Sequence, residues 1–563
     1  MDMKLLHKQF CRETFDKDGV ICGFEPVYED NFNFAYDVID RIAAEEPDRR
    51  AMVWCNVAGE ERTFTFGQMS EMSARAAALF QAQGIKKGDR VMLVLKRHYQ
   101  FWFAILALHK LGAIGIPATH LLTKKDYIYR FRSAGVSAII ATGEDETCTH
   151  IEQAMAEYDG IRARFIVRGE REGWLPFDKL IEETAPLSER IPTKATDTLL
   201  LYFTSGTTGY PKMVCHDHTY PIGHIITAKH WHNVDPDGLH LTVSETGWAK
   251  SMWGKLYGQW FMAAGIFVYD FDRFVPHDLL EKLQQYKVTT FCAPPTIYRF
   301  LIKEGLENYD LSSIQYVTTA GEALNPEVFR QFEQKTGLRI HEAFGQTETT
   351  VLLGNFVGSK TYKVGSLGKA CPLYDVTIVD EDGNEVPPGT TGEIVIRATP
   401  DRRPVGMFQK YFESDDKDAA RTEDVWHDGL YHTCDTAWMD EDGYYWYVGR
   451  TDDVIKSSGY RIGPFEIESV IMELPQVLEC GVTGVPDPIR GTVVKATIVL
   501  AKGYEPSDAL AKEIQNYVKE QTAPYKYPRI IEFVDELPKT ISGKIRRVEL
   551  RKAVTDRHCP PRP

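Results

Sequence analysis

The stretch Leu199-Leu-Leu-Tyr-Phe-Thr-Ser-Gly-Thr-Thr-Gly-Tyr-Pro-Lys212 is the one from which the organisation of this chain is inferred. Its first five residues are apolar and stop abruptly at hydroxyls and glycine, which predicts a buried strand followed by a loop. Glycines let successive backbone N–H groups converge on one anion, hydroxyls add donors, and Lys212 adds a positive charge. The loop is therefore suited to hold the phosphates of a nucleotide.

The loop is not a Walker A sequence, because that pattern requires Gly-Lys-Ser/Thr after four intervening residues, and Pro211 stands at the fifth position after Gly206. The nine-residue string at positions 204–212 resembles instead the signature loop of the adenylate-forming (AMP-binding) superfamily, which includes acyl-CoA synthetases, luciferases and carrier-loading adenylation domains. The resemblance implies that the following residues bind ATP and AMP: Thr204, Ser205, Gly206, Thr207, Thr208, Gly209 and Lys212.

Length and composition limit the number of domains, the kind of partner and the cellular compartment that can be expected. A chain of 563 residues is too long for one hydrophobic core, so two or more domains are expected. The net charge of −15 argues against a nucleic-acid partner. The ten cysteines include no Cys-x-x-Cys pair, which predicts reduced thiols in a cytoplasmic protein rather than a zinc site or a disulfide framework. The apolar residues 101–122 are broken by His109 and Lys110, so a core helix and a buried strand are expected there instead of a membrane span.

Helices alternate with short apolar strands along the first part of the chain. This alternation predicts α/β layers around a mainly parallel sheet. A small α+β domain is expected after Pro464, from one helix near that proline, two strands and a second helix. The segments behind these predictions are strands at 63–66, 91–95, 113–116, 136–141, 481–485 and 495–500, and helices at 70–83, 101–111 and 507–518.

Further stretches resemble the nucleotide-binding motifs of the same superfamily. Tyr316-Val-Thr-Thr-Ala-Gly-Glu-Ala-Leu324 resembles its adenine-binding turn, in which Gly321 and Glu322 would face the purine. In Glu342-Ala-Phe-Gly-Gln-Thr-Glu348, the resemblance implies that Phe344 stacks on adenine and Thr347 contacts the α-phosphate. Glu348 would hold Mg²⁺, which usually takes one or two protein carboxylates when it is bound to a nucleotide. The remaining residues implied for ATP and AMP are Glu342, Ala343, Gly345, Gln346, Asp435, Arg450 and Arg461.

Three residues are implied to line an acyl pocket: Trp248, Trp253 and Gly345. Acetate-specific relatives carry a bulky tryptophan where Gly345 stands, so glycine predicts a pocket deeper than acetate needs. Packing in the core is the alternative role for the tryptophans. The sequence departs from the family at Cys434, where glycine is usual, and a side chain there strains the backbone if φ is positive.

The C-terminal motifs imply a second, mobile domain. Asp452 matches the family's hinge and divides the chain into an AMP-binding domain at 1–451 and a mobile domain at 452–563. Lys544, in Ile541-Ser-Gly-Lys544, occupies the place of the family's catalytic lysine, although a lone lysine on a surface turn is normally inert. CoA is implied to contact Ser458, Gly459, Tyr460 and Arg490.

The resemblance extends from about residue 30 to residue 552 and is strongest to the medium-chain acyl-CoA synthetases. It implies a large α/β domain of layered sheets and helices with a distorted barrel, followed by a small mobile α+β domain. The implied enzyme is an ATP-, Mg²⁺- and CoA-dependent ligase that converts a short- to medium-chain carboxylate, straight or branched, to its CoA thioester through acyl-AMP, releasing AMP and pyrophosphate in fatty acid metabolism.

Three alternatives stay open at this point. The enzyme could load a separate carrier protein, or it could be an aryl-CoA ligase. A nucleotide-binding module without catalysis is the third, and intact Lys544, Glu348 and Asp435 count against it. The sequence does not distinguish a monomer from a homodimer, and it does not specify the acyl chain or the pathway.

Overall fold

The computed structural model describes residues 2–204, 211–412, 422–457, 460–487, 491–540 and 544–551, and the statements below concern these residues. A first sheet of eight strands runs in the order β21-β11-β10-β6-β5-β7-β8-β9. It is parallel from β10 to β9, with β11 and β21 antiparallel at one edge. The strands are β5 (Arg90–Val94), β6 (Ile114–Pro117), β7 (Ala138–Thr142), β8 (Ala163–Val167), β9 (Leu175–Pro176), β10 (Thr198–Thr204), β11 (Lys212–Asp217) and β21 (Lys410–Tyr411).

A second sheet of nine strands runs in the order β18-β17-β16-β15-β14-β12-β13-β3-β4 and is parallel from β16 to β3. Its strands are β3 (Arg50–Asn56), β4 (Glu61–Thr65), β12 (Leu239–Thr242), β13 (Gly265–Asp270), β14 (Thr290–Cys292), β15 (Tyr316–Thr319), β16 (Ile340–Gly345), β17 (Val351–Gly354) and β18 (Lys369–Ala370). The central strands of both sheets are mostly buried, and those of the first sheet are mostly apolar, as is typical of parallel strands covered on both faces. The predicted α/β layers are confirmed.

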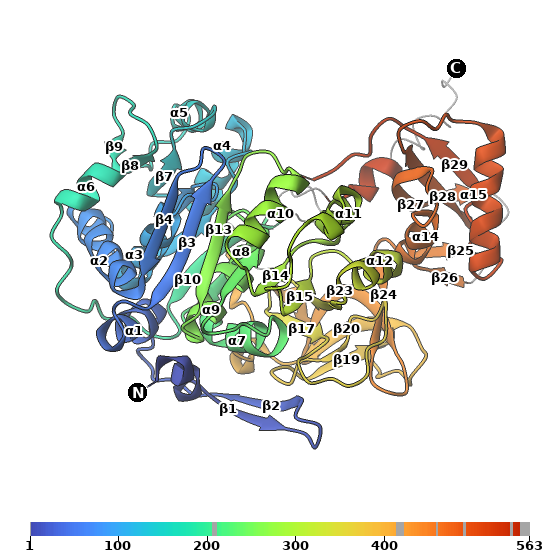
Figure 1. Cartoon of the computed structure of the whole chain (residues 1–563), viewed down its shortest axis with the longest axis horizontal. Coiled ribbons are helices and arrows are strands. Elements are labelled where there is room, and N and C mark those ends of the chain that lie inside the picture. Colours follow the sequence, from blue (N-terminus) through green and yellow to red (C-terminus); the bar gives the residue numbers. More distant parts are fainter. Residues whose placement is uncertain are drawn as a thin grey trace.

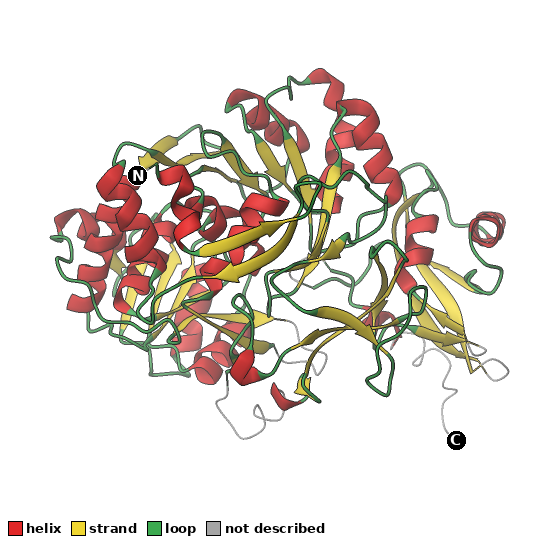
Figure 2. Ribbon diagram, turned by 90° about the horizontal axis from the view of Figure 1, so that it is seen from below, coloured by secondary structure: helices red, strands yellow, loops and turns green. Residues whose placement is uncertain are grey.

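The helices gather around these two sheets (Figure 2). The helix expected at 101–111 is α3 (Gln100–Leu111), in which every residue is buried. It packs on β5 and β6 of the first sheet, and the Trp102 indole N–H donates to the carbonyl of Lys255 at 2.7 Å, in a helix that packs on the second sheet. A helix that is apolar on all sides is one buried on all sides.

The other helices of the large domain are α1 (Arg41–Glu45), α2 (Phe66–Ala82), α4 (Lys124–Ala134), α5 (Thr147–Met155), α6 (Phe177–Glu183), α7 (Tyr220–Ile226), α8 (Ala249–Lys255), α9 (Tyr257–Phe261), α10 (Pro276–Gln285), α11 (Pro295–Glu304) and α12 (Pro326–Thr336). Short helical turns are η1 (Met3–Gln9), η2 (Ala35–Asp40), η3 (Thr227–Trp231), η4 (Leu306–Asn308) and η5 (Pro400–Arg402). The helix expected at 70–83 begins earlier, because Thr65 and Gln68 form a capping box ahead of α2.

A third sheet corrects one part of the expected fold. The described strands β19 (Val376–Val379), β20 (Gly392–Arg397), β22 (Trp426–His427), β23 (Leu430–Met439) and β24 (Tyr445–Arg450) form an open antiparallel sheet. The predicted distorted barrel is therefore wrong for this part of the chain, because β19 pairs with β20 but not with β22 at the other end of the sheet.

The C-terminal region forms a separate small domain at one end of the long axis (Figure 1). Its elements are β25 (Ile455–Ser457), β26 (Tyr460–Ile462), α14 (Pro464–Ile471), β27 (Val477–Asp487), β28 (Gly491–Leu500), α15 (Asp508–Gln521) and β29 (Ile530–Phe533). Residues such as Ile467, Val482 and Ile514 give it a hydrophobic core of its own. The expected α+β domain is confirmed, and its boundary at Asp452 stays a prediction.

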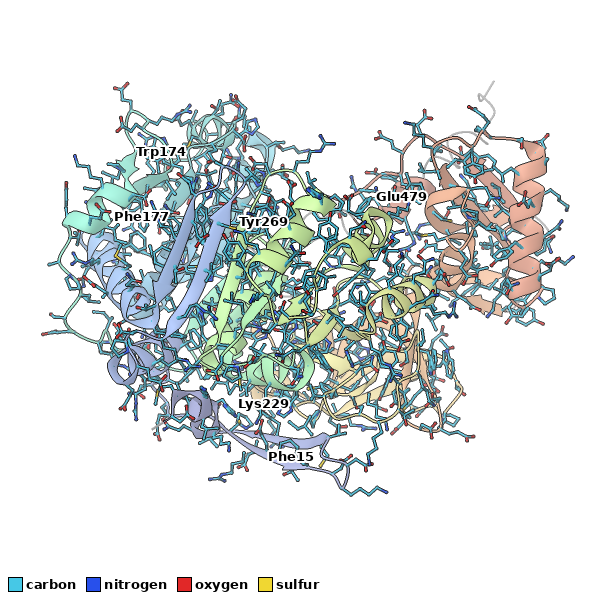
Figure 3. The ribbon with its side chains drawn as sticks, viewed as in Figure 1. Phe15, Trp174, Phe177, Lys229, Tyr269 and Glu479 are labelled. Atoms are coloured by element: carbon cyan, nitrogen blue, oxygen red, sulfur yellow. The ribbon has the colours of Figure 1, made fainter. Side chains whose placement is uncertain are left out.

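An N-terminal hairpin of β1 (Cys11–Phe15) and β2 (Ile21–Pro26) projects from the large domain (Figure 1). It is anchored by Glu13, which accepts hydrogen bonds from Lys229 Nζ at 2.5 Å and from His230 Nε2 at 2.6 Å. Lys229 also lies 6.0 Å from the centre of the Phe15 ring (Figure 3). A buried contact between Glu13 and Lys229 thereby attaches the hairpin to the large domain. No pattern in residues 1–61 predicted this contact.

Candidate active site

The predicted nucleotide site lies where parallel strands of the two large sheets end. β10 ends at Thr204, β15 ends two residues before Gly321, and β16 ends at Gly345. In open α/β sheets, ligands bind outside the carboxyl ends of the strands. Thr204 pairs with Lys212 across β10 and β11, so these two residues flank the phosphate loop. The loop residues themselves lie outside the described residues: Ser205, Gly206, Thr207, Thr208 and Gly209.

A tyrosine that sequence reasoning missed connects Lys212 with Glu348. Lys212 Nζ lies 4.7 Å from the centre of the Tyr411 ring. The Tyr411 hydroxyl donates to Glu348 Oε1 at 2.9 Å. Burial, and then the charge of Glu348, raise the pKa of Tyr411, so its hydroxyl remains a donor at neutral pH. A cation, a hydroxyl and a carboxylate thus lie together beside the phosphate loop.

The carboxylate of Asp435 is buried and held from two sides. Tyr447 donates to Oδ1 at 2.9 Å, and Gln346 Nε2 donates to Oδ2 at 2.6 Å. The Tyr431 hydroxyl donates to Gln346 Oε1 at 2.8 Å and so fixes the orientation of that amide. Burial raises the pKa of Asp435, and Arg450, 3.9 Å away, opposes the rise. Each carboxylate oxygen keeps a lone pair for a further donor, such as a ligand hydroxyl.

The turn expected to face adenine is open on one side. Gly321 has φ +100°, and a Cβ built there would meet nothing within 4 Å. Glu322 is exposed and accepts a hydrogen bond from the Thr296 hydroxyl at 3.2 Å. Phe344 is half-buried, with its ring tilted against that of Tyr447 at 6.1 Å. A flat ligand would therefore find an aromatic face and an open glycine turn in this region.

The two residues before Phe344, Glu342 and Ala343, are buried and do not face an open space. Glu342 is buried and accepts a hydrogen bond from the backbone N–H of Leu324 at 2.9 Å, and burial raises its pKa to about 8. Ala343 is also buried. The backbone at Thr347 is held by His216, whose Nε2 donates to the Thr347 carbonyl at 2.7 Å. The carboxyl group of Glu342 thus supports the turn that precedes α12.

The space beside Gly345 is filled, which corrects the expectation of an open volume there. A Cβ at Gly345 would lie 2.5 Å from Cη2 of Trp253 and 2.4 Å from the carbonyl oxygen of Thr350. Trp253 is 6% exposed and fills this space from α8. Trp248 precedes α8 and is half-buried. The space that the missing side chain of Gly345 leaves is therefore occupied by the indole of Trp253, which belongs to another part of the chain.

The segment that joins the two domains carries several ion pairs. Asp452 is exposed, and its Oδ1 lies 3.6 Å from Arg450 Nε. The next residue, Asp453, contacts Arg551 at 2.8 Å and Arg547 at 3.5 Å. The chain's last described residues are thus tied to Asp453, while Asp452 contacts only the large-domain side among the ion pairs of the described residues.

Lys544 follows residues 541–543, which lie outside the described residues, and it is exposed. Its backbone is held by Thr540, whose N–H donates to the Lys544 carbonyl at 2.8 Å and whose Oγ1 accepts from the Lys544 N–H at 3.1 Å. Burial is the main influence on the pKa of Asp435 and of Lys250, and the Lys544 charge contributes to lowering both. Lys544 therefore presents an exposed ammonium from a turn of the small domain that Thr540 holds.

Three of the four residues predicted to contact CoA lie outside the described residues: Ser458, Gly459 and Arg490. The side chain of Arg461, predicted to bind ATP and AMP, also lies outside them. Tyr460 is described, is 50% exposed, and stacks on Tyr525 with ring centres 4.0 Å apart. It thus presents an exposed aromatic face on the small domain.

Cys434 has a left-handed backbone conformation, so the backbone strain that was expected there if φ is positive is present. Its φ is +57°, in the left-handed region that costs energy for any residue with a Cβ. The conformation is held by hydrogen bonds on both sides: the Cys434 N–H donates to Glu393 at 2.8 Å, and its carbonyl accepts from the Thr451 N–H at 3.0 Å. The strained residue directly precedes Asp435.

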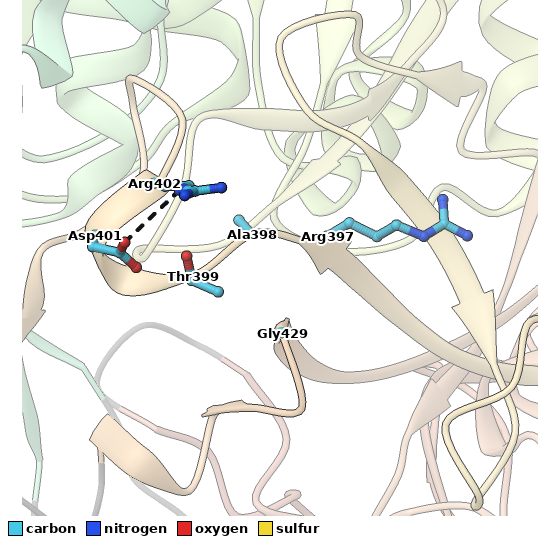
Figure 4. Close-up of a pocket in the computed structure, with 6 residues that line it drawn as sticks. All are labelled: Arg397, Ala398, Thr399, Asp401, Arg402 and Gly429. Carbon is cyan, nitrogen blue, oxygen red and sulfur yellow. Dashed lines mark ion pairs between the residues drawn. The ribbon is translucent and has the colours of Figure 1, made fainter.

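A surface pocket elsewhere contains none of the predicted residues (Figure 4). It is lined by Arg397, Ala398, Thr399, Asp401, Arg402 and Gly429. Its only ion pair among the drawn residues joins exposed Asp401 and Arg402 at 3.9 Å. An exposed ion pair of this kind contributes little to stability. Because none of the predicted site residues lines this pocket, the strand ends described above remain the candidate site.

Comparison with known proteins identifies the family. Residues 39–412 match the family model of the AMP-binding enzyme, and residues 466–544 match that of the AMP-binding enzyme C-terminal domain. The chain is 41% identical over 531 residues to human mitochondrial acyl-coenzyme A synthetase ACSM3, covering 92% of this chain and 89% of the relative. It is 42% identical over 544 residues to mitochondrial acyl-coenzyme A synthetase ACSM5 of Rattus norvegicus, covering 95% and 92%.

Solved structures agree with this assignment. The anthranilate CoA ligase AuaEII in complex with anthranoyl-AMP has a TM-score of 0.85 at 28% identity, covering 94% of this chain and 98% of that one. A benzoate CoA ligase from Burkholderia xenovorans LB400 has a TM-score of 0.80 at 27% identity, covering 92% and 100%.

The comparisons correct the expected localisation. The prediction of a cytoplasmic protein is wrong, since the relatives named above are mitochondrial synthetases. The absence of a Cys-x-x-Cys pair, on which the prediction rested, indicates reduced thiols without specifying a compartment. Among the described helices, none combines the length and the apolar character needed to cross a membrane.

ATP and CoA are substrates of this family's acyl-CoA synthetases. The chain therefore belongs to the AMP-binding enzyme family, as an acyl-CoA synthetase of the medium-chain type.

Proposed function

We propose that this enzyme activates a short- to medium-chain carboxylate, straight or branched, at the strand ends described above, as a step in fatty acid metabolism. One observation carries the proposal: Lys212, Tyr411 and Glu348 lie together at the end of β10, and Gln346, two residues before Glu348, holds the buried carboxylate of Asp435. Cations and carboxylates are thereby arranged around the place where a nucleotide and its metal would bind.

In the first step, a carboxylate oxygen attacks the α-phosphorus of ATP. The bond from that phosphorus to the oxygen bridging the α- and β-phosphates breaks, and pyrophosphate leaves with the electron pair. Lys212 and Lys544 stabilise the negative charge that develops on the phosphate oxygens, as positioned cations do. Asp435 and Arg450 bind the ribose hydroxyls, Phe344 stacks on adenine, and the turn at Gly321 faces its edge.

Glu348 fits the role of a magnesium ligand. Its Oε1 accepts from Tyr411, and within the described part of the chain no hydrogen bond reaches Oε2. A hard carboxylate oxygen with a remaining lone pair is what Mg²⁺ takes on a nucleotide. When bound, the metal neutralises charge on the phosphates.

In the second step, the small domain turns about Asp452, so that Lys544 leaves the site and the residues at 458–460 enter. The thiol of CoA, after losing its proton, attacks the acyl carbon of acyl-AMP. The bond from that carbon to the phosphate oxygen breaks, and AMP leaves. One chain thus forms two active sites by moving one domain.

The acyl pocket has Trp248 and Trp253 as walls. Trp253 against Gly345 limits its depth on one side, which favours short or branched acyl groups over long straight ones. Aryl acids are the second candidate, because solved structures of similar fold are those of anthranilate and benzoate CoA ligases.

The test is pyrophosphate release by the purified enzyme, with ATP and Mg²⁺, over straight, branched and aromatic carboxylates, with and without CoA. The proposal predicts release with short- to medium-chain aliphatic acids, straight or branched, and acyl-CoA formation only when CoA is present. Activity confined to aromatic acids would favour the second candidate, and no release with any acid would contradict the proposal.

A further inference from the structure

The loop at residues 244–248, here called the Trp248 loop, connects β12 to α8 and carries Trp248. The backbone carbonyls of this loop accept hydrogen bonds from side chains of α8. Lys255 Nζ, fully buried, donates to the Ser244 carbonyl at 2.7 Å. The Ser251 hydroxyl lies 2.8 Å from the carbonyl oxygen of Trp248, to which it donates, and 3.2 Å from that of Thr246. These bonds come from α8 itself, so they hold the loop to its own helix.

A second set of bonds comes from the first sheet, beginning with Lys96. This residue follows β5 and has φ +44°, a left-handed conformation that is unfavourable for lysine. In this conformation its carbonyl accepts two hydrogen bonds from Thr246, from the backbone N–H at 3.2 Å and from the hydroxyl at 2.5 Å. Thr246 is fully buried. Strain of this kind persists only where the surroundings hold the residue in place.

Three carboxylates hold the side chain of Lys96. Its Nζ lies 2.9 Å from Glu144, 2.6 Å from Asp145 and 2.8 Å from Asp272, and the side chain is 2% exposed. Asp145, Asp272 and His120 place ligand atoms within 4.8 Å of one another, which is close enough for a metal ion. The ammonium of Lys96 already bonds both aspartates, so the cluster serves to anchor this lysine.

Glu245 forms the second connection between the Trp248 loop and the first sheet. Its side chain is buried and accepts from the Thr119 hydroxyl at 3.0 Å and from the His120 N–H at 3.3 Å, with His120 Nδ1 at 3.2 Å. Thr119 and His120 follow β6. At Gly247 the two backbones touch, since a Cβ there would lie 2.4 Å from the Thr119 nitrogen. The buried carboxylate of Glu245 keeps all these hydrogen bonds only when the Trp248 loop stays in this position.

We propose that Lys96 and Glu245 are positioning residues that clamp the Trp248 loop onto the first sheet and thereby set the acyl-chain selectivity of the enzyme. The clamp joins the strand ends of one large sheet to a loop of the other, directly before the tryptophan assigned to the pocket wall. This inference rests on the proposed function, in particular on Trp248 as part of that wall. Neither residue contacts the reacting atoms, so both act through Trp248.

The test compares Glu245→Ala, Glu245→Gln, Lys96→Met and Trp248→Ala with the wild type, and uses Glu172→Ala, an exposed site, as control. KM and kcat for a C2–C8 carboxylate series and KM for ATP are measured by pyrophosphate release. Glu245→Ala removes the buried bonds to Thr119 and His120, and Lys96→Met removes the three carboxylate contacts that hold Lys96 in its left-handed conformation. Each change should raise the KM of the preferred carboxylate about 10-fold, with KM for ATP within about twofold. Glu245→Gln keeps a carbonyl acceptor and should restore KM to within about threefold.

A double variant separates positioning from a general loss of structure. If Glu245 acts through Trp248, adding Glu245→Ala to Trp248→Ala should change the carboxylate KM by less than about twofold, because the effects of coupled residues do not add. Should Glu245→Ala fail to fold, Thr119→Val removes one of the same bonds, and about a threefold rise in the carboxylate KM is expected.

An unchanged carboxylate profile in folded Glu245→Ala or Thr119→Val, or fully additive effects in the double variant, would overturn the inference while Trp248→Ala still alters the profile. If Trp248→Ala leaves the profile unchanged, the pocket wall is misassigned and the inference falls with it. Absence of pyrophosphate release by the wild type with every acid would contradict the proposed function itself.

Discussion

Gly345 and Trp253 are complementary in shape: a Cβ on the glycine would lie 2.5 Å from Cη2 of the indole, so the tryptophan occupies the space that the missing side chain leaves. The two residues come from β16 and α8, which belong to distant parts of the chain. Changing either residue alone disturbs this pair, and in the proposed acyl pocket we expect Trp253 together with Gly345 to set the depth.

Trp253→Ala should shift the preference of the enzyme toward longer acyl chains. Removing the indole frees space next to Gly345, and each methylene that it accommodates is worth about 1 kcal/mol. The ratio of kcat/KM for C8 over C4 carboxylates should rise about 10-fold or more, at a cost of about 3 kcal/mol in stability. Trp174→Ala, at a buried tryptophan in another region, is the control and should leave this ratio unchanged. An unchanged ratio in folded Trp253→Ala would remove Trp253 from the pocket.

Cys434→Gly should stabilise the protein. At φ +57° a Cβ is unfavourable, and glycine adopts this conformation without that cost. A gain of about 1 kcal/mol in the free energy of unfolding is expected from denaturant titration. Cys434→Ser keeps a Cβ at the same φ and should bring no gain. Equal stability of the glycine variant and the wild type would show that the surrounding hydrogen bonds relieve the strain.

The sequence allowed much of the architecture to be predicted, because its signals are local. The apolar run before Thr204 became β10, and the apolar residues at 101–111 became the fully buried α3. At Cys434, where the family has glycine, the condition named for backbone strain is met, because φ is positive. Each of these features is set by a few consecutive residues.

What could not be predicted depends on residues far apart in sequence. Tyr411 bonds Glu348 across 63 positions, and Thr119 bonds Glu245 across 126 positions. Nothing in the aromatic run that contains Tyr411 marks it as a partner of Glu348. The filling of the space at Gly345 was missed for the same reason, since a glycine in sequence does not show which distant side chain lies against it.

Glu342→Gln should change the dependence of stability on pH. Burial raises the pKa of Glu342 to about 8, from 4.5 in an exposed chain. Between these values the folded state holds a proton that the unfolded chain releases. Stability contributed by protonated Glu342 is therefore present at low pH and is lost as pH rises through this window, by about 1.4 kcal/mol per pH unit for one proton.

Thermal unfolding of wild type and Glu342→Gln between pH 5 and pH 9 measures this effect. Glutamine keeps an acceptor for the Leu324 N–H and does not titrate, so the variant should lose less stability than the wild type as pH rises. Parallel pH profiles for the two proteins would show that Glu342 does not hold the proton.

Asp452→Pro should separate the two half-reactions. Proline fixes φ near −65°, which restricts a hinge, while Asp452→Ala removes the ion pair with Arg450 and leaves φ free. Pyrophosphate release in the first turnover should persist in both variants. Steady-state acyl-CoA formation should fall about 10-fold or more in the proline variant alone. Equal turnover of the two variants would place the hinge elsewhere.

The most direct test of the account is the pair of half-reactions catalysed by Lys544→Ala. Lys544 is exposed on the small domain, and in the proposed mechanism it stabilises only the first transition state. Lys539→Ala, at a lysine of the same segment that pairs with Glu479 at 2.6 Å, is the control and should retain both reactions. The account predicts that Lys544→Ala forms acyl-AMP at least about 100-fold more slowly, yet converts supplied acyl-AMP and CoA to the thioester at nearly the wild-type rate. Equal loss of both half-reactions, or normal acyl-AMP formation, would contradict it.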